Sequence, residues 1–224
     1  MIRLEALGKR FSPGPQALQG IDLDIDSNAW VLISGGSGCG KTTLLHLIMG
    51  LEQPTEGKVF LQHQHLGRLN AQVRARLRAN IGLIFQEPHL LQRRSLIENV
   101  ALPLELAGQF GRTVHQRALQ SLDLLGLSAR ASALPSQVSS SERQLACIAR
   151  ALITRPSLIV ADEPLARLDS QNAARVSGLL RSRHSAGGLT IVQTCAEDCL
   201  TLPEATARYT LSNGRLAPSQ PSAS

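Results

Sequence analysis

Apolar residues along this chain follow two patterns, short β-like runs and longer stretches at helical spacing. In the first 61 residues the strand pattern occurs at 2–5, 18–25, 30–33 and 58–61. The first two of these segments flank a turn rich in proline and glycine at 12–15. Between the third and the fourth, apolar positions at 44–48 recur as they do on one face of a helix. The N-terminal part is therefore predicted to be mostly β structure with one short helix.

Beyond residue 80, apolar runs alternate with helical segments. Runs typical of buried strands occur at 81–85, 158–161 and 189–192. Helical spacing occurs at 95–106, 113–125, 139–152 and 171–183. Ser139 precedes the third of these helices, and Glu142 follows three positions later, which is the capping-box arrangement at a helix start. Because apolar strands that alternate with helices usually form a parallel sheet, the pattern predicts an α/β fold.

The C-terminal end carries two further signals. Ser212-Asn213-Gly214 predicts the turn of a β-hairpin. From Ala217 to the end the sequence is rich in serine and proline, so residues 217–224 are predicted to be disordered.

A glycine-rich segment lies between the strand predicted at 30–33 and the helix predicted at 44–48. Residues 35–42 read Gly-Gly-Ser-Gly-Cys-Gly-Lys-Thr, which matches the phosphate-binding loop pattern G-x-x-x-x-G-K-[ST] in its strand–loop–helix setting. Glycines let successive N–H groups point at anionic oxygens, and the helix N-terminus adds partial positive charge. The expected phosphate-contacting residues are Gly35, Gly36, Ser37, Gly38, Cys39, Gly40, Lys41, Thr42 and Thr43.

Within this loop, Lys41 is expected to reach the β- and γ-phosphates, and the Thr42 hydroxyl is expected to ligate Mg²⁺. The alternative is a glycine-rich turn with an unrelated lysine. At average residue usage the four fixed positions coincide by chance about once per hundred chains of this size. The sequence therefore predicts a protein that binds a nucleoside triphosphate.

Length and composition limit the number of domains and the classes of protein that fit, but they do not indicate a function. The chain has 224 residues, enough for one large domain or two small ones, and no apolar run approaches the about 20 residues of a membrane span. Its N-terminus does not resemble a secretory signal, and its four cysteines are expected to be free thiols in a reducing cytosol.

The net charge of +6 comes mainly from arginine and suits nucleic acid, anionic lipid or an acidic partner, although a genomic bias toward arginine is the favoured explanation. Aromatic residues make up only 3% of the chain, so few platforms exist for stacking single-stranded nucleic acid.

Two acidic residues follow the buried strand predicted at 158–161. Asp162 and Glu163 are expected at the carboxyl edge of the parallel sheet, where the phosphate loop also lies. There an aspartate can hold the Mg²⁺ shell and a neighbouring glutamate can polarise an attacking water. Gln86, at the end of another predicted strand, can bridge metal and water. The alternative is a pair of solvated acids where a strand runs into a loop.

With these residues in place, the chain resembles the ATP-binding-cassette (ABC) ATPases over nearly its whole length. The matching segments are 35–43, 84–86, 148–152, 161–164 and 168–169. Three further segments resemble the FtsE subfamily of cell-division ATPases, which work with the membrane protein FtsX. These segments are 17–20, 81–91 and 98–104 with 107–108. The lipoprotein-release ATPases of the LolD subfamily are close relatives, and the segment 142–144 is equally common there.

The resemblance implies an ABC ATP-binding domain over residues 1–216, with a P-loop NTPase core, an antiparallel β lobe and an inserted α-helical subdomain at about 87–152. It implies that Phe11 stacks on adenine, although the residue alone reads equally well as a half-buried strand aromatic. It also implies a head-to-tail homodimer in which Ser139 and Ser141 contact the partner's ATP. A permease-like membrane protein, FtsX-like, would dock beside Gln86 at the cytoplasmic face of the bacterial inner membrane, and no nucleic-acid partner is expected.

The chain departs from the family pattern in two places. The signature, Leu-Ser-Gly-Gly before Gln or Glu in the family, reads Val-Ser-Ser-Ser-Glu at 138–142, and Leu145 stands where an arginine is usual. The switch histidine of the family falls at Cys195, and a neutral thiol is a weak hydrogen-bond donor. These departures lead to the hypothesis that ATP binding is intact while hydrolysis is slow or absent.

Other functions stay open at this point. A LolD- or MacB-type export or lipoprotein-release subunit fits the same motifs, and so does an adaptor that binds ATP without hydrolysing it. The interpretation as a nucleic-acid-associated cassette ATPase is supported by the net charge alone. It is disfavoured because such proteins usually carry long insertions, for which this chain has no room. A P-loop kinase lacks any segment that resembles a substrate lid.

Overall fold

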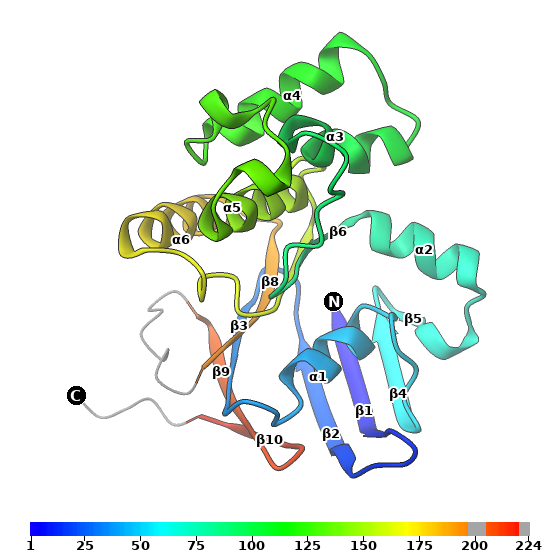
Figure 1. Ribbon diagram of the computed structural model, residues 1–224. Coiled ribbons are helices and arrows are strands. Elements are labelled where there is room, and N and C mark those ends of the chain that lie inside the picture. Colours follow the sequence, from blue (N-terminus) through cyan, green and yellow to red (C-terminus); the bar gives the residue numbers. More distant parts are fainter. Residues whose placement is uncertain (197–204, 220–224) are drawn as a thin grey trace. The chain divides into compact units, whose positions relative to one another are not determined.

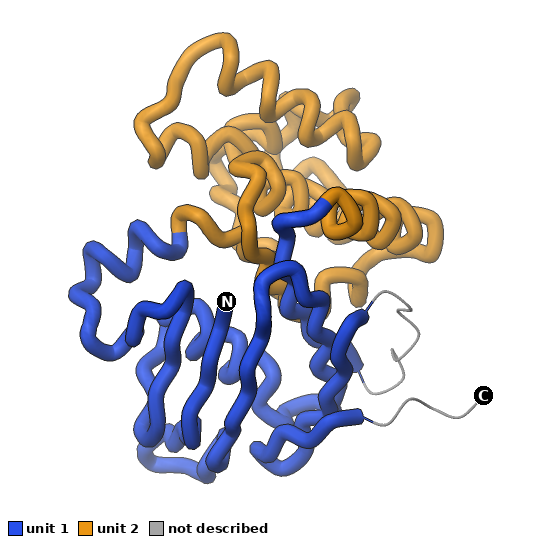
Figure 2. The backbone as a smooth tube through the Cα atoms, turned by 180° about the vertical axis from the view of Figure 1, so that it is seen from behind, with its two compact units in different colours: residues 1–78, 187–224 blue, residues 79–186 orange. Residues whose placement is uncertain are grey.

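The computed structural model describes residues 1–196 and 205–219, which form two compact units (Figures 1 and 2). Unit 1 consists of residues 1–78 and 187–224, and unit 2 consists of residues 79–186. Unit 2 therefore contains strands and a further helix besides the helices expected at 87–152.

Unit 1 contains an antiparallel sheet. Its strands are β1 (Ile2–Arg10), β2 (Gln16–Ile25), β4 (Glu56–Leu61) and β5 (Gln64–His65), in the order β2-β1-β4-β5. In β2 the apolar residues from Leu18 to Ile25 are buried while Asp22 and Asp24 are exposed, so one face of the sheet packs into the core. Helix α1 (Lys41–Ile48) contacts β2 and β4 and buries its leucines against them (Figure 1). The short helices η1 (Leu66–Arg68) and α2 (Ala71–Ala79) follow, and α2 buries none of its residues.

The remaining described strands of unit 1 are three parallel strands and one antiparallel strand at the C-terminal end. Strand β3 (Trp30–Ser34) runs parallel to both β8 (Thr190–Cys195) and β9 (Ala207–Ser212), and all five of its residues are buried. This explains why its sequence is a continuous apolar run rather than an alternation. Strand β10 (Arg215–Pro218) pairs with β9 as the predicted hairpin around Asn213.

Two predictions in this region need correction. Strand β8 continues three residues beyond the predicted end at 192, because its residues up to Cys195 pair with β3 up to Ser34. The tail is not disordered from Ala217, because Ala217 and Pro218 pair with β9 and the N–H of Ser219 donates to the carbonyl of Arg208. Residues 220–224 of the predicted tail lie outside the described residues.

Unit 2 combines two parallel strands with a cluster of helices. Strands β6 (Ile81–Ile84) and β7 (Leu158–Ala161) pair in parallel. The helices are α3 (Leu96–Leu106), α4 (Arg112–Asp123), α5 (Ser140–Leu152) and α6 (Ser170–Ser185), with short 3₁₀ turns at 128–130 and 135–137. Helices α3, α4 and α5 pack on one another (Figure 1), and their shared core includes the fully buried Val100, Leu122 and Ile148.

Side chains fix where these helices begin. Ser95 and Glu98 form a capping box at α3, and Ser139 and Glu142 form the predicted one at α5. Asp169 caps α6 by accepting the N–H of Asn172 at 2.8 Å. Over residues 1–196 and 205–219, no helix is both long enough and apolar enough to cross a membrane.

Candidate nucleotide-binding site

The glycine-rich loop of unit 1 joins the end of β3 to the start of α1, as the sequence predicts. Gly38 and Gly40 adopt φ angles of 75° and 109°, a region that side chains rarely tolerate. A Cβ atom on Gly35 would lie 2.4 Å from the carbonyl oxygen of Leu211 in β9, which excludes a larger residue there. The loop therefore takes a tight curl that only glycine permits at these positions, with a backbone suited to cradle phosphate oxygens.

Lys41 is buried, and its ammonium group lies over this loop. Its Nζ donates to the carbonyl oxygens of Gly35 at 2.7 Å and of Gly36 at 3.1 Å. These contacts hold the cation against the first two residues of the loop. A phosphate oxygen entering the loop would find the ammonium already in place.

The helix that follows is open at its N-terminus. Gly40 is the N-cap of α1, no side chain caps the helix, and its first turn contains no acidic residue. The helix end therefore keeps its partial positive charge for an anion. Thr42 lies in the first turn of this helix and is an exposed residue.

Phe11 follows the last residue of β1, and 43% of its surface is exposed. The ring is therefore not a half-buried strand aromatic. Lys9 Nζ lies 4.9 Å from the ring centroid and is held there by Glu52 Oε2 at 3.0 Å and the Gln53 carbonyl at 2.8 Å. Phe11 is thus an accessible ring with a fixed cation nearby.

Cys195 is the last residue of β8 and pairs in register with Ser34, the residue that leads into the phosphate loop. It is 5% exposed. The predicted switch position is therefore adjacent to the loop strand within unit 1. Among the other cysteines, Cys147 is fully buried, and burial raises the pKa of its thiol, which favours a packing role. Cys199 lies outside the described residues.

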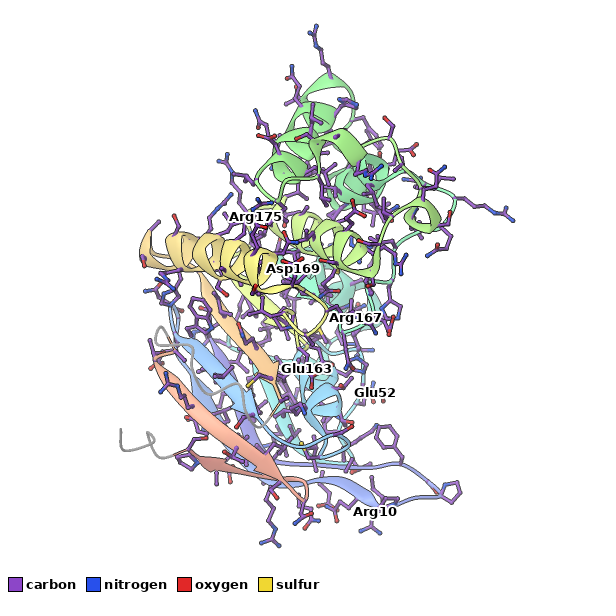
Figure 3. All side chains as sticks on the ribbon, turned by 60° about the vertical axis from the view of Figure 1, so that its left-hand side comes forward. Arg10, Glu52, Glu163, Arg167, Asp169 and Arg175 are labelled. Carbon is purple, nitrogen blue, oxygen red and sulfur yellow. The ribbon has the colours of Figure 1, made fainter. Side chains whose placement is uncertain are left out.

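The predicted acidic residues lie in unit 2. Asp162 directly follows β7, is 5% exposed, and its N–H donates to the carbonyl of Ile84 at 2.8 Å. Glu163 has φ of 43°, so the chain turns sharply at this residue. Gln86 Nε2 donates to Glu163 Oε2 at 3.4 Å, which is a long contact between two of the predicted catalytic side chains. The position of Glu163 can be followed in Figure 3. The oxygen donors of Thr42, Gln86 and Asp162 are of the type that Mg²⁺ prefers.

The signature segment forms the start of α5. Ser139 Oγ accepts the N–H of Glu142 at 3.1 Å, and the carboxylate of Glu142 accepts the N–H of Ser139 at 2.8 Å. The second bond lowers the pKa of Glu142. The Ser139 hydroxyl also hydrogen-bonds to the Glu142 carboxylate, which lowers the pKa of Glu142 further, so both groups of the capping box are engaged with each other.

Two neighbours distinguish this segment from the family pattern. Ser141 Oγ is buried and has no hydrogen-bond partner among the described residues. Leu145 is 2% exposed and belongs to the core, so it offers no charge to the surface where the family usually has arginine.

Replacing Ser139 with alanine is expected to lower the free energy of unfolding by about 1 kcal/mol, because the capping acceptor of α5 is lost. Urea denaturation of the purified protein measures this change. Ser140→Ala is the matched control, since Ser140 is exposed and is not the cap. Equal shifts of the two variants would show that the Ser139 cap contributes nothing.

Comparison with known proteins finds similarity over nearly the whole chain. The family model described as "ABC transporter" matches residues 18–166. The cell division ATP-binding protein FtsE of Escherichia coli (strain K12) is 37% identical over 218 residues, which is 96% of this chain and 97% of that protein. The lipoprotein-releasing system ATP-binding protein LolD of Psychrobacter arcticus is 43% identical over 172 residues, which is 76% of each chain.

The fold is also similar to that of solved ATP-binding cassettes. One of them, a dimer in a post-hydrolysis state bound to ADP and Pi, superposes with a TM-score of 0.92 and 30% identity, covering 98% of both chains. The predicted α/β cassette fold is therefore confirmed.

Proposed function

The chain belongs to the ABC transporter family, and on this premise we propose that it is an FtsE-like ATP-binding subunit that works with an FtsX-like membrane protein in bacterial cell division. ATP-binding cassettes of this family dimerise and pair with membrane permease subunits. FtsX as the particular partner, and a peripheral position at the cytoplasmic face of the inner membrane, are part of the proposal.

The FtsE-like assignment is supported by the 37% identity that covers 96% of this chain, and the ATP-binding role is carried by the glycine loop with Lys41 held over it. Its backbone N–H groups and the ammonium would bind the β- and γ-phosphates of ATP, and Phe11 would stack on adenine. The residues proposed to bind ATP within one subunit are Phe11, Gly35, Gly36, Ser37, Gly38, Cys39, Gly40, Lys41, Thr42 and Thr43. Ser139 is proposed to contact the ATP of the partner subunit, whereas the predicted contact of Ser141 is not proposed for its hydroxyl, because Ser141 Oγ is buried.

Three oxygen-bearing side chains are proposed to hold Mg²⁺, namely those of Thr42, Gln86 and Asp162. When bound, the ion would neutralise phosphate charge. Glu163 would orient and polarise the attacking water, and the Gln86 amide, which already contacts Glu163, would hold this carboxylate in position.

Hydrolysis is proposed to be slow. Lys41, Thr42, Gln86, Asp162 and Glu163 are present, whereas the switch position holds a thiol and the signature glycines are serines. The thiol of Cys195 is a weak donor toward the γ-phosphate. Side chains at 140–141 add bulk where a glycine backbone would approach the partner's nucleotide closely.

A LolD- or MacB-type export or lipoprotein-release subunit is the second candidate function. It is favoured by the 43% identity to the LolD protein, although that match covers less of this chain than the match to FtsE does. An adaptor that binds ATP without using its hydrolysis is a third, favoured by Cys195.

Co-purification with membrane partners tests the proposal. The tagged chain is co-expressed with an FtsX-like protein of its own organism or, separately, with a lipoprotein-releasing permease, and complexes are isolated from detergent-solubilised membranes. The chain is expected in the complex only with the FtsX-like protein. Recovery only with the lipoprotein-releasing permease would contradict the cell-division assignment and favour the second function.

A further inference from the structure

The loop between β6 and α3 in unit 2 is held by side chains from outside it. Backbone carbonyls of residues 85, 86, 88 and 89 each accept a hydrogen bond from a long side chain. The donors are Gln144 to Phe85 at 3.4 Å, Arg167 to Gln86 at 3.0 Å, and Arg150 to Pro88 at 2.9 Å and to His89 at 3.0 Å. The segment that carries Gln86 is therefore fixed in its main chain.

Arg167 differs from the other two donors in where it comes from. Gln144 and Arg150 lie on α5, whereas Arg167 lies between β7 and α6, four residues after Glu163 (Figure 3). Its Nε donates to the carbonyl of Gln86, and its Nη2 pairs with the carboxylate of Glu87. One planar guanidinium thus bonds two consecutive residues of the loop, which a lysine cannot do with the same geometry.

The same short segment also contacts the Gln86 side chain. Gln86 Nε2 donates to Glu163 Oε2 at 3.4 Å. Between Glu163 and Arg167 the chain is folded by turns, in which Ala166 N–H donates to the Glu163 carbonyl at 3.2 Å. Gln86 is therefore held at both ends by one segment, its main chain by Arg167 and its amide by Glu163.

We propose that Arg167 is a positioning residue for Gln86, which aims the Gln86 amide at the metal ion and at Glu163 by fixing the main chain around it. The inference rests on the proposed function, in which Gln86 is a ligand of Mg²⁺. Arg167 itself touches neither nucleotide nor metal in this account. Its effect passes through Gln86 alone.

The Arg167–Glu87 pair itself stabilises the fold little, because the two side chains are 37% and 65% exposed and solvent screens their attraction. Loss of Arg167 is therefore expected to change the geometry of Gln86 without unfolding the protein. Removal of a residue that hydrogen-bonds to a metal ligand and orients it typically lowers metal affinity by about 10–100-fold.

The test measures the Mg²⁺ concentration that half-saturates binding of a fluorescent ATP analogue, trinitrophenyl-ATP, to the full chain. Arg167→Ala is expected to raise this concentration about tenfold. For Arg167→Lys we expect a concentration between those of the native protein and of Arg167→Ala, because lysine retains only one of the two contacts. Arg93→Ala is the matched control, since Arg93 is exposed. The unfolding temperature of each variant is measured in parallel and is expected to stay unchanged.

A double-variant cycle separates positioning from a general structural role. In a Gln86→Ala background, Arg167→Ala is expected to have no further effect on the Mg²⁺ requirement. An equal tenfold loss in that background, or no loss in the native background, would overturn the inference while leaving the proposed function intact. If the native protein bound no analogue at any Mg²⁺ concentration, the proposed function would fail and the inference with it.

Discussion

Replacing Cys195 with histidine is expected to raise the rate of phosphate release by about 10²–10³-fold, the usual effect of one transition-state hydrogen-bond donor. Cys195 is the last residue of β8 and pairs with Ser34 at the end of β3, the strand that leads into the phosphate loop. An imidazole at position 195 would therefore lie on the strand next to β3. A histidine N–H donates far better than a neutral thiol. Phosphate release by the purified protein with saturating Mg·ATP measures the effect, with Ser140→Gly added in a second variant.

Cys195→Leu is the control for this experiment, because leucine adds bulk at the same buried position without adding a donor. Thermal unfolding of both variants shows whether the larger side chains are accommodated. A gain with histidine but not with leucine supports a slowed enzyme. If neither Cys195→His nor the variant with glycine at 140 gained activity, the protein would be better described as an adaptor that binds ATP without using its hydrolysis.

Replacing Lys41 with alanine is expected to weaken ATP binding by about 100-fold or more, because hydrogen bonds from a charged donor to phosphate are each worth about 1.5–3 kcal/mol. Fluorescence titration with trinitrophenyl-ATP measures the affinity. Lys58→Ala is the matched control, since Lys58 lies on β4 with a half-exposed side chain and a distant carboxylate partner, Glu5 at 3.9 Å. Equal affinities of the native protein and Lys41→Ala would contradict the role given to the loop.

The local geometry that the sequence predicted correctly, the glycine turn and the capping box, depends on local rules. The fixed spacing from Gly35 to Thr42 implied a curl between a strand and a helix, and the glycine conformations observed at 38 and 40 are what that curl requires. The spacing of Ser139 and Glu142 implied a capping box, which the structure contains. Such features involve residues close in sequence, whose geometry is set by backbone sterics and by hydrogen bonds within one turn.

The parts that the sequence did not predict depend on contacts between distant residues. The bond from Arg167 to Gln86 joins residues 81 apart, and no local pattern indicates it. The ion pair of Lys9 with Glu52, which fixes the cation near Phe11, spans 43 residues. Strand β8 was predicted too short because Gln193 and Thr194 are polar, yet both are buried by pairing with β3. Tertiary pairing decided these cases against local propensity.

The central claim is that the glycine loop and Lys41 bind the phosphates of ATP, and the most direct measurement is calorimetric titration of the native protein with Mg·ATP. We expect a saturable heat of association that Lys41→Ala abolishes and Lys58→Ala leaves unchanged. Absence of any heat at millimolar ATP, or an identical titration for Lys41→Ala, would contradict the account.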